Sequence, residues 1–120
     1  MLCVLFQVKV LGILAMVDDG ELDWKVIAID GSDPLAAKLS DISDLQRLAP
    51  EVVTGIREWF RWYKTPDGKP LNVFGFKEEA LPRHVAVEVI EETHGYWRDL
   101  VEGRTSPVTP GGTLWIPPKK

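Results

Sequence analysis

Cysteine and histidine are scarce in this chain of 120 residues. Cys3 is the single cysteine, which excludes an internal disulfide and a zinc site built from cysteines. The two histidines, His84 and His94, lack the spacing of a metal-binding pair, and we interpret both as surface or helix-packing residues. A single cysteine favours a reducing compartment, so we expect the cytoplasm and leave an organelle open.

The chain also lacks the short motifs of nucleotide-binding sites and of serine-hydrolase active sites. It contains no GxGxxG or GxxxxGK[ST] pattern, and no serine lies in a nucleophile-elbow context. Its formal net charge of −4 argues against a general nucleic-acid-binding protein, which usually has a basic face. Residues 1–17 are mostly apolar, but they lack a basic start and are interrupted by Lys9, so we expect neither export nor membrane insertion.

The composition that remains is that of an ordinary globular protein, with 45% hydrophobic and 27% charged residues. The length suffices for about one domain with a single core. Residues 103–120 are rich in proline and glycine and end in two lysines, which predicts an irregular tail. We therefore assign residues 1–102 to the domain and 103–120 to the tail.

The segment 8–31 predicts a β-hairpin. Residues 8–17 form an almost continuous apolar run, typical of a strand covered on both faces, and residues 23–30 predict its partner strand. A four-residue loop, 19–22, would pair Asp18 with Asp23.

In that register the alternation of side chains places Asp18, Asp23 and Lys25 on one face of the hairpin. A slip by one residue would scatter them. We expect exposed strand edges on such a hairpin, and therefore a tendency to associate.

Two main helices are predicted after the hairpin, which makes the fold class α+β. Apolar residues at helical spacing predict an amphipathic helix over 50–64, started by Pro50 and ended by the turn 65–68. A second helix is predicted over 82–101, with Ala86, Ile90, Thr93, Trp97 and Val101 on its apolar stripe. Before them, Asp41 or Ser43 could cap one short helical turn, and Phe74 and Phe76 are expected to anchor the linker on the core.

Two clusters of residues could carry chemistry. Carboxylates at Asp18 and Asp23, with Lys25 beyond them, suit Mg²⁺, which accepts one or two carboxylates and fills its other positions with water and phosphate oxygens. From spacing alone, a solvated acidic turn is the more common outcome. The second cluster is Arg61, Tyr63, Lys64 and Lys69, whose donors could bind phosphate, although Tyr63 also fits the apolar stripe of its helix.

Several blocks resemble the C-terminal half of the soluble family I inorganic pyrophosphatases of the eukaryotic type. These blocks are VKVLGILAMVDDGELDWKVIAIDGSDPLA, DISDL, EWFRWYKTPDGKP and EETHGYW, in colinear order over about Gln7 to Val101. The resemblance implies Mg²⁺-dependent hydrolysis of pyrophosphate to two phosphates, in a site at the mouth of a five-stranded OB-type barrel. It implies that Asp18 and Asp23 bind metal and that Lys25, Tyr63 and Lys64 bind phosphate.

The acidic D-x-D-P-x-D signature of that family has no counterpart here. The resemblance places metal ligands and the carboxylate that helps activate water in that signature, so no residue of this chain is assigned as catalytic. We expect a truncated pyrophosphatase with an incomplete barrel, poorly stable and essentially inactive alone. Alternatives are a non-catalytic fragment that binds an intact pyrophosphatase or another protein, and a small acidic metal-binding or scaffold domain. A homodimer or an association with full-length pyrophosphatase is left open.

Overall fold

The computed structural model describes residues 3–105, and the chain divides into two compact units, residues 1–87 and 88–120. The first unit contains the hairpin and the elements packed on it, and the second begins within the last helix. Most of the predicted tail, from residue 106 onward, lies outside the described residues. No helix in the described part is long and apolar enough to cross a membrane.

The hairpin consists of β1 (Val8–Asp18) and β2 (Glu21–Asp30), paired antiparallel. Asp19 and Gly20 form a two-residue turn with φ angles of 52° and 81°, the positive values that match the twist of a tight hairpin. The predicted four-residue loop is therefore wrong, because Asp18 pairs with Glu21 and Met16 with Asp23. This shift is an even number of residues, so Asp18 and Asp23 still share one face.

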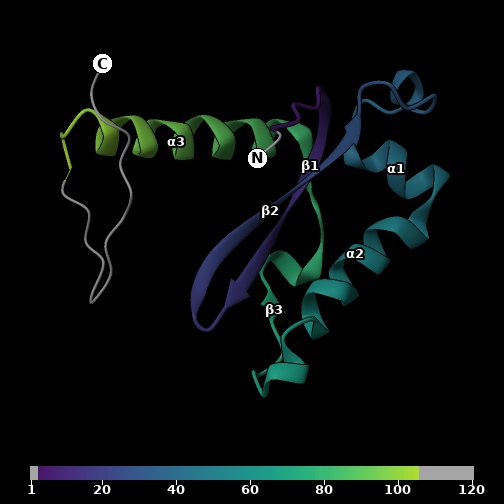
Figure 1. Ribbon diagram of the computed structural model, residues 1–120. Helices are drawn as coiled ribbons and strands as arrows, with labels where there is room; N and C mark the ends of the chain where they lie inside the picture. The colour runs from purple at the N-terminus through teal and green to yellow at the C-terminus, as the bar shows by residue number, and fades with distance from the viewer. Residues whose placement is uncertain (1–2, 106–120) are drawn as a thin grey trace. The chain divides into compact units, whose positions relative to one another are not determined.

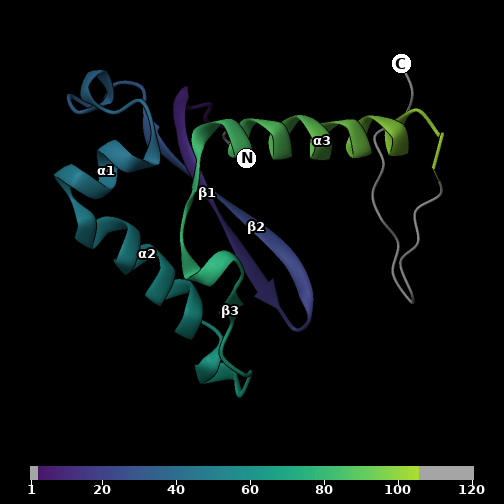
Figure 2. The same ribbon diagram turned by 180° about the vertical axis from the view of Figure 1, so that it is seen from behind.

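The sheet is small and open (Figure 1). Two short strands, β3 (Val73–Phe74) and β4 (Leu81–Pro82), pair with β1 on the side opposite β2. The strand order is β2-β1-β3, which leaves β2 at the edge of the sheet. Near the hairpin turn, β2 lies on the outer side of β1 in both views (Figures 1 and 2). The α+β class and the incomplete sheet are as predicted.

Two helices, α1 (Ile42–Leu48) and α2 (Pro50–Trp62), cover one face of the hairpin and form the core with it. The buried members of this core are Leu11, Leu14, Ile27, Leu39, Ile42, Leu45 and Val53. Every residue of β1 from Leu11 to Met16 is buried, as the continuous apolar run predicted.

The ends of the helices follow the predicted signals. Asp41 caps α1 in a capping box with Asp44, so Asp41 and not Ser43 starts this helix. Pro50 begins α2, and a 3-10 turn followed by left-handed Gly68 (φ 75°) stops the chain from continuing as a helix. Phe74 packs on the core as predicted, but Phe76 is exposed and stacks on Trp24 instead.

The last helix, α3 (Arg83–Val101), has the predicted extent. The predicted apolar stripe of α3 is largely uncovered: among its described residues, only Ala86 is buried. Ile90 and Trp97 are exposed, since within the described part of the second unit no element covers them.

Candidate functional site

The predicted site lies where the turn of the hairpin meets the C-terminal end of α2. Asp18 is the last residue of β1, and Lys64 follows α2 directly after Tyr63. The Lys64 ammonium donates to a carboxylate oxygen of Asp18, which joins residues 46 positions apart in the sequence. This hydrogen bond is the main reason that the pKa of Lys64 is raised above its ordinary value, and the negative charge of Asp18 adds to it.

The second ion pair of the site is formed within β2. The Lys25 ammonium lies 3.0 Å from a carboxylate oxygen of Asp23, and both side chains are partly exposed. The same ammonium lies 5.1 Å from the centre of the Phe60 ring, within cation–π range. Lys25 is therefore directed toward α2 by an aromatic side chain of that helix.

Tyr63 completes the set through aromatic contacts. Its ring stacks on Trp59 with centroids 5.1 Å apart and meets the edge of Phe60 at 5.7 Å. Phe60 thus lies between Lys25 and Tyr63, so both the hairpin and α2 contribute to one continuous set of contacts. The structure brings all five predicted site residues to the same end of the hairpin.

An acidic hollow of about 430 Å³ opens beside this set. It is lined by Asp18, Asp19, Glu21, Leu22 and Asp23. Within residues 3–105, no three histidine, cysteine or carboxylate side chains come close enough together to hold a metal ion by themselves. At the rim of this hollow, Asp18 is paired with Lys64 and Asp23 with Lys25.

Arg61, another residue of the second cluster, forms ion pairs with two glutamates of the fold. Its guanidinium pairs with Glu58 at 3.0 Å and with Glu78 at 2.5 Å, and these hydrogen bonds, that of Glu58 first, raise its pKa. It also lies 5.4 Å over the Phe74 ring. Lys69 is exposed and follows Gly68, outside the set around Tyr63.

Asn72 is a buried polar residue that the sequence analysis missed. Its side-chain amide donates to the Phe60 carbonyl at 2.9 Å, and its backbone N–H donates to the Arg61 carbonyl at 3.1 Å. These bonds satisfy carbonyls at the end of α2 and hold the linker against the turn that presents Tyr63 and Lys64. No local pattern marks Asn72, because its partners are defined only by the return of the linker to the helix.

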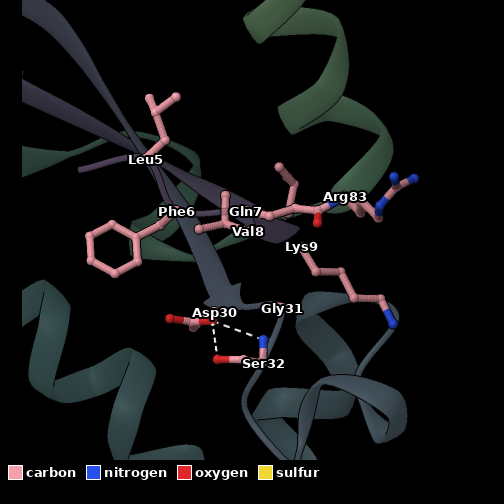
Figure 3. Close-up of a pocket in the computed structure, with 10 residues that line it drawn as sticks. Leu5, Phe6, Gln7, Val8, Lys9, Asp30, Gly31, Ser32 and Arg83 are labelled. Carbon is pink, nitrogen blue, oxygen red and sulfur yellow. Dashed lines mark hydrogen bonds between the residues drawn. The ribbon is translucent and has the colours of Figure 1, made fainter. Parts of the chain in front are cut away.

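A larger hollow, of about 790 Å³, lies at the opposite end of the hairpin (Figure 3). Its lining combines the extended arm before β1 with the end of β2, where Ser32 donates to the Asp30 carboxylate at 2.7 Å. None of the five predicted site residues lines it. We therefore place the candidate site at the acidic hollow and not here.

Comparison with known proteins gives a consistent result over most of the chain. A family model described as inorganic pyrophosphatase matches residues 1–98. The inorganic pyrophosphatase of Bos taurus is 54% identical over 101 residues, which are 84% of this chain and 35% of that protein. The Zygosaccharomyces bailii inorganic pyrophosphatase is 54% identical over 100 residues, 83% of this chain and again 35% of the relative.

Solved structures agree with the sequence comparisons. A recombinant inorganic pyrophosphatase from T. brucei brucei superposes with a TM-score of 0.78 at 40% identity, covering 81% of this chain and 28% of that one. The type I inorganic pyrophosphatase of Toxoplasma gondii gives a TM-score of 0.76 at 52% identity, covering 79% and 41%. The chain thus spans about a third of the length of the curated relatives that it matches.

Proposed function

Because the chain belongs to the inorganic pyrophosphatase family, we propose that its hairpin and the end of α2 form one wall of a Mg²⁺–pyrophosphate site. Asp18 and Asp23 are the metal ligands of this wall, and Lys25, Tyr63 and Lys64 are its phosphate ligands. The reaction is hydrolysis of pyrophosphate to two phosphates. The observation that supports the proposal most is the Lys64–Asp18 contact, which brings a cation from just beyond α2 to the carboxylates of the hairpin.

Two carboxylates are a suitable donor set for Mg²⁺ in this setting. The ion binds through one or two carboxylates and keeps water and substrate phosphate oxygens as its other ligands, so a cage made only of protein groups is not needed. When bound, Mg²⁺ would offset the charge of the phosphates and lower the pKa of a bound water. The residues that would hold the ion are Asp18 and Asp23, which line the acidic hollow.

The two lysines have a double role in the proposal. With no anion present, each ammonium balances one carboxylate, which keeps two acidic groups stable at the same end of the hairpin. When a phosphate is present, the same ammonium groups can donate to its oxygens while the carboxylates bind metal. The stacking of Tyr63 on Trp59 limits the motion of its ring, so its hydroxyl is held at the end of α2.

Binding of the metal with its substrate tests this assignment directly. Calorimetric titration of the chain with pyrophosphate and MgCl₂ should show Mg²⁺-dependent binding, and Asp18→Ala or Asp23→Ala should weaken it at least tenfold, about 1.4 kcal/mol. Asp33→Ala is the matched control, since Asp33 accepts from the Leu35 N–H in a loop away from the hollow. Equal binding by all three variants would contradict the metal assignment.

The chain by itself is proposed to be essentially inactive. It spans about a third of its relatives, and its sequence contains no D-x-D-P-x-D cluster to supply further metal ligands and activate water. Positioning and charge stabilisation from one wall leave the attacking water without a base. Phosphate release from pyrophosphate by the purified chain should therefore stay at the background rate with saturating Mg²⁺. A clear Mg²⁺-dependent rate would refute this part of the proposal.

A further inference from the structure

Lys25 has two side-chain partners in the described part of the chain, and they belong to different elements. Its ammonium lies 3.0 Å from the Asp23 carboxylate and 5.1 Å from the centre of the Phe60 ring. Asp23 is two residues away on the same strand and the same face, whereas Phe60 belongs to α2. The lysine side chain is 26% exposed, so most of it is covered. The ammonium is therefore held between a charge of its own strand and an aromatic ring of the helix.

The ionic partner of Lys25 is the one that metal binding would remove. In the proposed function Asp23 is a metal ligand, and a carboxylate bound to a divalent cation no longer balances a neighbouring ammonium. Positive charge at Asp23 repels the Lys25 ammonium. Lysine has a flexible four-carbon stem, so without a second partner its ammonium would turn into solvent. The Phe60 ring is uncharged, and its attraction for the ammonium therefore persists when Asp23 is occupied.

The Phe60 ring is itself held in place by its neighbours. Its centroid lies 5.0 Å from that of Trp59 and 5.7 Å from that of Tyr63, and the ring planes are nearly perpendicular in both pairs. The Phe60 carbonyl accepts a hydrogen bond of 2.9 Å from the side-chain amide of the buried Asn72, which fixes the backbone at this residue. The ring that meets Lys25 is thus joined to Tyr63, the other proposed phosphate ligand beside it.

We propose that Phe60 is a positioning residue for pyrophosphate binding, whose ring keeps the Lys25 ammonium directed toward the end of α2 when Asp23 binds metal. The inference rests on the proposed function, in which Lys25 is a phosphate ligand, and assigns a role to a side chain that has no polar atom. An aliphatic side chain of similar size would fill the same space, but it lacks the negative ring face that attracts a cation. Tyrosine retains that face, so Phe60→Leu and Phe60→Tyr separate the attraction from the packing.

Nuclear magnetic resonance of the ¹³C-labelled chain tests the Phe60–Lys25 contact without metal or substrate. The Hε signal of Lys25, assigned with Lys25→Arg, should lie upfield of its random-coil position because of the ring current of Phe60. Phe60→Leu should move the signal back, whereas Phe60→Tyr should retain the shift. Phe74→Leu is the matched control and should also retain it, since the cation over the Phe74 ring is Arg61, at 5.4 Å. An unshifted Lys25 signal in the unmodified chain would overturn the proposal without any variant at position 60.

Calorimetric titration with pyrophosphate and MgCl₂ tests the role in binding. Phe60→Leu should raise Kd about three- to fivefold, and Phe60→Tyr should retain most of the affinity. In a Lys25→Met background, Phe60→Leu should have no further effect, because the ring acts through the ammonium. An unchanged Kd for Phe60→Leu, or the same loss in both backgrounds, would overturn the proposal and leave the proposed function standing. Absence of Mg²⁺-dependent binding by the unmodified chain would instead refute the proposed function, and the role of Phe60 in pyrophosphate binding with it.

Discussion

Replacement of Gly12 by alanine should destabilise the unit that carries the site. A Cβ atom at this position would lie 2.6 Å from the Leu81 carbonyl oxygen and 2.8 Å from Cβ of Ile42. Neither atom can move aside cheaply, because Leu81 belongs to β4, which pairs with β1, and Ile42 is a buried residue at the start of α1. Relief therefore requires a shift of a strand or of the helix.

Overpacking of this kind costs about 1–3 kcal/mol. With a urea m-value of about 1 kcal/mol/M for a domain of this size, the unfolding midpoint should fall by about 1–3 M. Urea titrations followed by circular dichroism and tryptophan fluorescence measure the shift. For a marginally stable chain, a loss of this size could leave no folded population in dilute buffer.

Gly55→Ala is the matched control, since it makes the same chemical change inside α2. Apart from its chain neighbours and the backbone of its own helix, no heavy atom lies within 4 Å of the Cβ that would be added, so the substitution should stabilise the chain by about 0.5–1 kcal/mol through helix propensity. Opposite signs for the two variants are the expected result. A neutral or stabilising Gly12→Ala would refute the close packing of β1 against β4 and α1.

Three further perturbations have defined outcomes. Leu14→Ala removes a fully buried core side chain and should cost about 2–5 kcal/mol in urea titrations, so a loss below 1 kcal/mol would contradict the described core. Asp41→Ala removes the cap of α1 and should cost about 1 kcal/mol, whereas Ser43→Ala should change the midpoint little. The raised pKa of Lys64 means that its contribution to stability is complete below its ordinary value of 10.5 and is lost as pH rises through the higher folded value. Lys64→Met should therefore make the alkaline decline of stability shallower, and an unchanged decline would argue against the Lys64–Asp18 contact.

Local signals in the sequence were sufficient for the main elements. The almost continuous apolar run of residues 8–17 predicted a strand covered on both faces, and Pro50 marked the start of α2. Asp41 was one of two candidate caps for the helical turn that became α1. The shared face of Asp18 and Asp23 was predicted although the register was wrong, because the two registers differ by an even number of residues. Asp19-Gly20 is itself a two-residue turn signal, and it would have predicted the observed register.

Features that depend on tertiary contacts could not be predicted from local sequence patterns. Lys64 reaches Asp18 because α2 packs on the hairpin, which neither segment encodes alone. Phe76 was predicted to be a core anchor, but it lies in a left-handed turn and is exposed. The apolar stripe of α3 was predicted from its periodicity, but periodicity does not indicate what covers such a stripe, and Ile90 and Trp97 on it are exposed.

A chimera measures the central claim most directly. In the bovine relative, the matched stretch of 101 residues is replaced by the corresponding residues of this chain, and phosphate release from pyrophosphate is measured with and without Mg²⁺. We predict that the chimera hydrolyses pyrophosphate in a Mg²⁺-dependent way. Asp23→Ala or Lys64→Met in the chimera should lower the rate of hydrolysis at least a hundredfold, about 2.7 kcal/mol. A chimera that folds but is inactive, or one whose rate is unchanged by these substitutions, would contradict the assignment of the hairpin and the end of α2 to the pyrophosphate site.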